Sequence, residues 1–100
     1  MQRFGKADRH IKAKAGKTFA LELEAMGTAG YTWSVSRLPP HLLLRGESIR
    51  PAAPGVGASS LQEFTFEVMG PGSEKLVLSY GQPWEKKVDE TLEISVDATG

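Results

Sequence analysis

Apolar and polar residues alternate along most of this chain with a period of two. The runs in which the alternation is clearest are 18–24, 31–35, 61–68, 75–80 and 91–97. In each run one face carries aromatic or branched apolar side chains, and the other carries mostly charged, hydroxyl or small ones. This pattern is typical of half-buried antiparallel strands and predicts an all-β protein.

Two further segments give weaker signals. Residues 11–15 predict a weak first strand that ends before Gly16. Residues 42–49 fit either a buried strand or one helical turn, although Gly46 argues against a long helix. Segments rich in glycine and proline separate the runs, at 39–40, 51–60, 70–73 and 81–84. Short strands at a spacing of roughly 8–12 residues, with turn signals between them, predict an antiparallel β-sandwich.

The direction of the strands predicts which connections lie together. In an antiparallel sandwich each connection reverses the chain, so alternate connections emerge at the same end. Counting from the strand at 18–24, the connections at 26–30, 51–60 and 81–87 should meet at one pole. The count assumes that 42–49 is one strand.

These three connections share a chemistry. Two are rich in glycine and small side chains, and the third presents Trp84 behind Pro83. Glycine lets a backbone approach another surface closely, and an exposed tryptophan is a frequent energetic anchor at interfaces. For a single loop, simple turn formation is the plainer interpretation. Three such loops at one pole favour a binding edge shaped to enter a cleft.

Composition limits the range of functions. The chain has 100 residues, the size of one small domain, and 40% of them are apolar, enough for a single core. The formal net charge is zero, which argues against coating of nucleic acid or of an anionic membrane. Cationic residues crowd the first 17 positions. This segment predicts a solvated arm, which could be flexible over residues 1–10, or an edge strand kept soluble by lysines. A basic arm for an acidic partner is the less favoured alternative.

Catalytic chemistry finds little support. The chain has no cysteine, so there is no disulfide, thiolate metal site or cysteine nucleophile. His10 and His41 have no obvious nucleophile or metal-ligand partner, and we expect both on the surface. The stretch 15–18 resembles the end of a phosphate-binding loop, but Ile11 stands where the motif needs a glycine. We expect no enzyme activity, no metal and no cofactor.

No segment has the unbroken apolar length to span a bilayer, and no signal peptide is visible at the amino terminus. These observations leave the compartment open.

An ordered trio of motifs gives the chain a family resemblance. Gly30-Tyr31-Thr32-Trp33 follows a threonine-containing tip, a Gly-x-Gly loop comes next, and Pro83-Trp84 completes the set. This order resembles the chagasin family of cysteine-peptidase inhibitors over about residues 11–96. The resemblance implies an immunoglobulin-like β-sandwich. It also implies reversible, non-covalent inhibition of papain-like cysteine peptidases by three loops that occlude the active-site cleft.

The motifs carry over residue by residue. In the family the first loop reads Asn-Pro-Thr-Thr-Gly followed by aromatic-x-Trp, so Thr28, Gly30, Tyr31 and Trp33 match. The family's third loop reads Arg-Pro-Trp, and here Gln82 replaces the arginine. We expect Trp33 in the core beneath the first loop. The peptidase-binding residues that the resemblance implies are Met26, Gly27, Thr28, Ala29, Gly30, Tyr31, Gly55, Val56, Gly57, Ala58, Ser59, Gln82, Pro83 and Trp84.

The resemblance also implies a single inhibitor domain over residues 1–100 that acts as a monomer on a cysteine peptidase, without nucleic acid, membrane or cofactor. Members of the family are often exported, which makes an exported or periplasmic location an expectation from resemblance alone. Fold does not fix function, however. An immunoglobulin-like adhesion or assembly module without inhibitory activity is the alternative.

Overall fold

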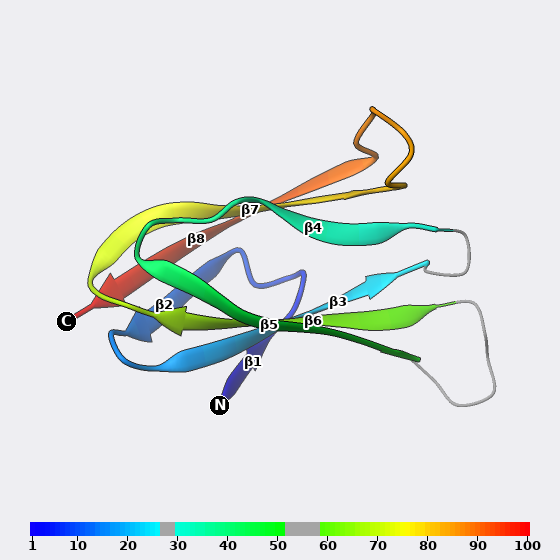
Figure 1. Cartoon of the computed structure of the whole chain (residues 1–100). Helices are drawn as coiled ribbons and strands as arrows, with labels where there is room; N and C mark the ends of the chain where they lie inside the picture. The colour runs from blue at the N-terminus through cyan, green and yellow to red at the C-terminus, as the bar shows by residue number, and fades with distance from the viewer. Residues whose placement is uncertain (27–29, 52–58) are drawn as a thin grey trace.

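Strands that pair into two sheets make up the computed structural model, and the sheets pack face to face (Figure 1). The strands are β1 (Gln2–Phe4), β2 (His10–Lys14), β3 (Thr18–Ala25), β4 (Thr32–Arg37), β5 (Leu42–Pro51), β6 (Ser60–Val68), β7 (Gly72–Gly81) and β8 (Glu90–Thr99). One sheet has the order β1-β3-β6-β5 and the other β2-β8-β7-β4. The structure describes residues 1–26, 30–51 and 59–100, and within these ranges there is no helix. The predicted all-β sandwich is therefore confirmed.

No helix long and apolar enough to cross a membrane occurs among these described residues.

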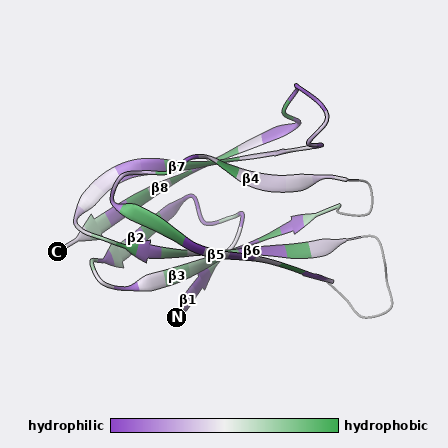
Figure 2. Ribbon diagram, viewed as in Figure 1, coloured by the Kyte–Doolittle hydropathy of each residue, from purple (hydrophilic) through white to green (hydrophobic). Residues whose placement is uncertain are grey.

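The apolar faces of the alternating strands form one core between the sheets. Figure 2 shows the hydrophobic stretches of β3, β6, β7 and β8 interrupted by polar positions. The largest fully buried side chains are Ile11, Phe19, Leu21, Leu23, Phe64, Phe66, Val68, Leu76, Leu78, Leu92, Ile94 and Val96. Each contributes about 1.5–3 kcal/mol by leaving water. The ring centroids of Phe19 and Phe66 lie 5.4 Å apart, so cross-strand aromatic packing adds to this burial.

Two strand pairs are parallel, so the expectation of a purely antiparallel sandwich is wrong in this respect. β1 runs parallel to β3, and β2 runs parallel to β8. The chain reverses direction from one strand to the next, so two strands that are an even number of steps apart run the same way. Both exceptional pairs have this even separation, whereas the other pairs have an odd one and are antiparallel.

The ambiguous segment after the proline pair is strand β5, which pairs along its length with β6. A register shift between Leu44 and Gly46 marks a bulge in it. With this segment a strand, the assumption behind the count of reversals holds. Ala25 and Pro51 both lie opposite Ser60, and Thr32 lies opposite Gly81. We call the end of the sandwich at which β3, β5 and β7 end the loop pole.

The basic amino-terminal segment supplies an edge strand to each sheet. β1 borders one sheet and β2 borders the other. On the outer face of the first sheet, Glu22 and Glu63 are cross-strand partners, and their two negative charges repel each other. Arg3 from β1 and Arg50 from β5 form ion pairs with both carboxylates. These guanidinium groups offset the repulsion and keep the edges of the sheet charged, which discourages edge-to-edge association.

His41 is buried, with 7% of its surface exposed, so the expectation of a surface histidine is wrong. Its Nε2 donates a hydrogen bond to the carbonyl of Val96 at 3.1 Å. The imidazole packs on Gly72, where an added Cβ would come within 2.9 Å of the ring Cγ. The residue therefore closes the end of the core that is remote from the loop pole.

We predict that Gly72→Ala lowers the free energy of unfolding by about 1–3 kcal/mol, because the new methyl group would strike the His41 ring. Gly70→Ala is the matched control, since an added Cβ there meets no atom within 4 Å. Urea unfolding of the two variants measures the difference. Equal stability of both would contradict the packing described for His41.

A second prediction concerns Asp97. The Ser73 hydroxyl and the His10 ring both bond its carboxylate, and together they hold the pKa of Asp97 below its ordinary value. A carboxyl with a lowered pKa in the folded state stabilises the protein above about pH 4, and this contribution is lost as the pH falls through the folded pKa. Wild type should melt at a higher temperature than Asp97→Asn at pH 7, and the gap should close below pH 4. A gap that persists unchanged at pH 2 would refute this assignment.

Candidate functional site

The loop pole carries three connections: the first (26–31) joins β3 to β4, the middle (52–59) joins β5 to β6, and the third (82–89) joins β7 to β8. Of the predicted contact residues, Gly27, Thr28, Ala29, Gly55, Val56, Gly57 and Ala58 lie outside the described residues. Those that the structure describes are Met26, Gly30, Tyr31, Ser59, Gln82, Pro83 and Trp84. The strands place these described residues at one end of the sandwich, although they are up to 58 positions apart in the chain.

Trp33, near the start of β4, lies in the core beneath the first connection, as predicted. Only 4% of its surface is exposed. Its indole Nε1 donates a hydrogen bond to the carbonyl of Glu24 at 2.9 Å, and its ring lies 4.8 Å from that of Tyr80. A buried tryptophan whose N–H has a partner combines apolar packing with a fixed orientation. The residue thus ties β4 of one sheet to β3 of the other.

Gln62 on β6 forms a second bridge between the sheets. Its Oε1 accepts a hydrogen bond from the backbone N–H of Trp33 at 2.6 Å, and its Nε2 donates to the Trp33 carbonyl at 3.1 Å. Both backbone groups of a buried edge-strand residue are satisfied by one side-chain amide. The sequence interpretation missed this residue. The available signal was a polar side chain in phase with the buried Phe64 and Phe66.

Tyr80 and Tyr31 extend the network to the third connection. The Tyr80 hydroxyl accepts a hydrogen bond from the backbone N–H of Met26 at 2.9 Å, and its ring stacks on Tyr31 with centroids 5.5 Å apart. The Tyr31 N–H donates to the Met26 carbonyl at 3.2 Å. The carboxylate of Asp89 lies beside the Tyr31 hydroxyl and raises the pKa of this phenol above its ordinary value.

Together Tyr31, Trp33, Gln62 and Tyr80 form a cluster that we call the clasp. It joins β3, β4, β6 and β7 at the points where the three connections begin or end. The clasp therefore fixes the positions from which the connections leave the body.

Trp84 lies in the third connection with 68% of its surface exposed. The backbone N–H of Glu85 donates to the carbonyl of Gln82 at 3.0 Å, which closes a turn that has Pro83 and Trp84 at its centre. Proline at the second turn position restricts the backbone before the tryptophan. The indole is thus presented to solvent on a constrained turn.

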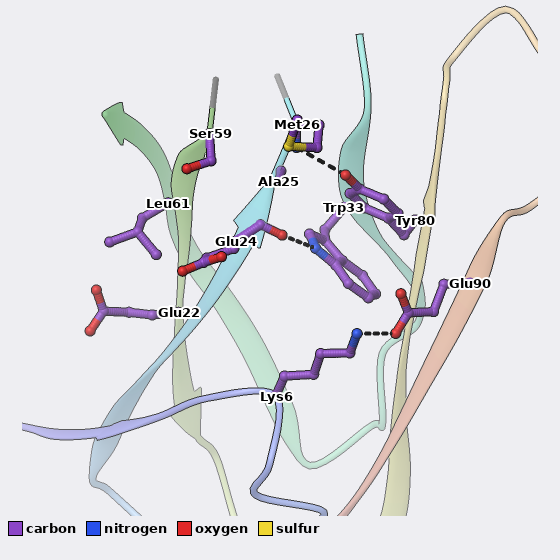
Figure 3. Close-up of a pocket in the computed structure, with 10 residues that line it drawn as sticks. All are labelled: Lys6, Glu22, Glu24, Ala25, Met26, Trp33, Ser59, Leu61, Tyr80 and Glu90. Atoms are coloured by element: carbon purple, nitrogen blue, oxygen red, sulfur yellow. Dashed lines mark hydrogen bonds and ion pairs between the residues drawn. The ribbon is translucent and has the colours of Figure 1, made fainter. Parts of the chain in front are cut away.

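A pocket of about 580 Å³ opens beside the clasp, and Figure 3 shows its lining. Trp33 and Tyr80 form one wall, and Glu24 lies across from them. An ion pair between Lys6 and Glu90 closes one end, with the ammonium 5.8 Å from the centroid of the Trp33 ring. Within the described residues, no group of three histidine or carboxylate side chains could hold a metal ion. The arrangement can position loops and contact a partner.

We predict that Gln62→Met lowers the free energy of unfolding by about 2–4 kcal/mol, because it leaves the Trp33 N–H and carbonyl buried without partners at nearly constant side-chain volume. Ser36→Ala, on the strand β4 that also carries Trp33, is the control. It removes exposed hydroxyl contacts to Ser79 and Val77 and should cost less than about 1 kcal/mol. Chemical denaturation compares the two, and a Gln62→Met variant as stable as the control would exclude Gln62 from the clasp.

The sequence model described as "Chagasin family peptidase inhibitor I42" matches residues 12–97. No curated protein matches the sequence significantly.

Several solved structures have the same fold. The cysteine protease inhibitor EhICP2 from Entamoeba histolytica aligns with a TM-score of 0.81 at 23% identity, over 97% of this chain and 94% of that one. Amebosin aligns with a TM-score of 0.74 at 21% identity, over 98% and 97%. PbICP-C, solved in complex with falcipain-2, aligns with a TM-score of 0.66 at 14% identity, over 99% and 100%.

Proposed function

This chain belongs to the chagasin family of peptidase inhibitors, and from that membership we propose that it is a reversible, non-covalent inhibitor of papain-like cysteine peptidases. The structural neighbours support this target class, because EhICP2 is described as a cysteine protease inhibitor and PbICP-C was solved bound to falcipain-2. The observation that carries the proposal is the loop pole, where three connections leave one end of a body held together by the clasp.

The proposed mechanism is steric. The first connection would fill the peptidase cleft near its catalytic cysteine, the stretch from Gly55 to Ser59 would line one side by backbone contacts, and Trp84 would pack on the other. No covalent bond needs to form, because the first connection excludes substrate without offering a well-placed scissile peptide.

The body contributes alignment. Three loops that had to be ordered separately would each lose conformational entropy on binding, which lowers affinity. Here hydrogen bonds and ring contacts fix the strand ends on both sides of the core before the peptidase arrives. An interface of ordinary size, roughly 800 Å² on each partner, is within reach of three aligned loops.

Trp84 is the described residue from which the largest single contribution is expected, because its indole is mostly exposed in the free protein and would be buried in the complex. We predict that Trp84→Ala weakens inhibition of papain by about 2 kcal/mol, or about 30-fold in Ki, with little change in melting temperature. Competitive titration with a small fluorogenic substrate measures the Ki.

Met69→Ala is the matched control, because Met69 is also an exposed apolar residue, at 56%, but follows β6 at the end remote from the loop pole. Its Ki should equal that of wild type. An unchanged Ki for Trp84→Ala would remove Trp84 from the interface. Absence of inhibition across a panel of papain-like peptidases, together with concentration-dependent self-association, would favour the adhesion or assembly module instead.

A further inference from the structure

Two glycines adopt a positive φ in the described part of the chain, and their surroundings differ. Gly16 has a φ of 88° and Gly30 a φ of 83°. An added Cβ at Gly16 would meet no atom within 4 Å. An added Cβ at Gly30 would overlap Cη2 of Trp84 and would come within 2.9 Å of Cζ3 and 3.3 Å of Cζ2. The positive φ alone explains why position 16 is a glycine. At position 30 the lack of a side chain also leaves room for the Trp84 indole.

The three Trp84 atoms at this contact form the outer edge of the six-membered ring. The outer edge of the ring therefore lies next to Gly30, while most of the Trp84 surface stays open to solvent. This contact joins the first connection to the third, across 54 positions of sequence.

Gly30 is itself held in place by the clasp. The next residue, Tyr31, stacks on Tyr80, and its N–H bonds the carbonyl of Met26. Tyr80 lies on β7, the strand that leads into the third connection. The backbone at position 30 and the turn that carries Trp84 are thus supported by the same ring pair.

We infer that Gly30 is a positioning residue, which acts as a seat for the Trp84 indole and orients that ring before a partner binds. A side chain at position 30 would push the ring out of this seat. An indole that is oriented before binding loses less rotational freedom when it meets a partner surface. The effect of the seat on inhibition rests on the proposed function, but the seat itself can be tested in the free protein.

The first experiment measures the motion of the indole without any peptidase. The two tryptophans give two indole N–H signals in a ¹⁵N NMR spectrum, and the heteronuclear NOE of each reports its mobility on the picosecond to nanosecond timescale. Gly30→Asn should lower this NOE for Trp84 and leave that of Trp33 unchanged. Asparagine is chosen because it tolerates positive φ better than most residues that carry a Cβ.

Gly16→Asn is the matched control, because it places the same residue at a similar φ with open space around the Cβ. It should leave the Trp84 signal as in wild type. An unchanged NOE for Trp84 in Gly30→Asn, or equal changes in both variants, would overturn the inference.

The second experiment is a double-mutant cycle on inhibition of papain. Gly30→Asn should raise the Ki by about tenfold in the wild-type background and by less than about twofold in the Trp84→Ala background, because the seat acts only through the indole. An equal rise in both backgrounds would mean that position 30 acts independently of Trp84 and would refute the inference. If wild type inhibits no peptidase, the proposed function fails, and the NMR result still decides whether the seat exists.

Discussion

The hydrogen bonds between Gln62 and the backbone of Trp33 are the constraint on which the binding end of this molecule depends. Burial of apolar surface holds the two sheets together, but this driving force is non-directional. The amide of Gln62 and the indole of Trp33 add directional bonds between β6, β4 and β3 across the core. Tyr80 then connects this bridge to β7. The ends of the strands that carry the three connections are therefore held in one arrangement.

This constraint separates the roles of the body and the loop pole. In the proposed mechanism the body aligns the loops, and its outer charges pair across the sheet at Arg3, Glu22, Glu63 and Arg50. The loop pole carries the exposed indole of Trp84 above the clasp. A family that inhibits by occlusion needs loops that are aligned before contact, because every residue ordered during binding lowers the affinity. Bonds deep beneath the loops meet this need without occupying the contact surface.

Much of this architecture can be predicted from the sequence, because strand positions follow from local alternation and chain reversals place alternate connections at one pole. The parallel pairing of β1 with β3 and of β2 with β8 could not be predicted, because it depends on which strand lies beside each of these edge strands in the folded protein. The burial of His41 and the bridge made by Gln62 depend on contacts across 55 and 29 positions. The motifs indicate the residue types at Gly30 and Trp84, but their contact depends on the geometry of two turns. The peptidase contacts of all the predicted site residues stay predictions from family resemblance, and the residues at 27–29 and 55–58 also lie outside the described part of the chain.

A crystal structure of this protein bound to papain would decide between occlusion by the loop pole and binding elsewhere. Our account predicts that the first connection lies over the catalytic cysteine without a covalent bond. It also predicts that Trp84 is buried against the rim of the cleft, and that the hydrogen bonds of Gln62 and Trp33 are unchanged from the free protein. A complex in which the peptidase contacts the β1 or β5 edge, or in which those hydrogen bonds are broken, would contradict it.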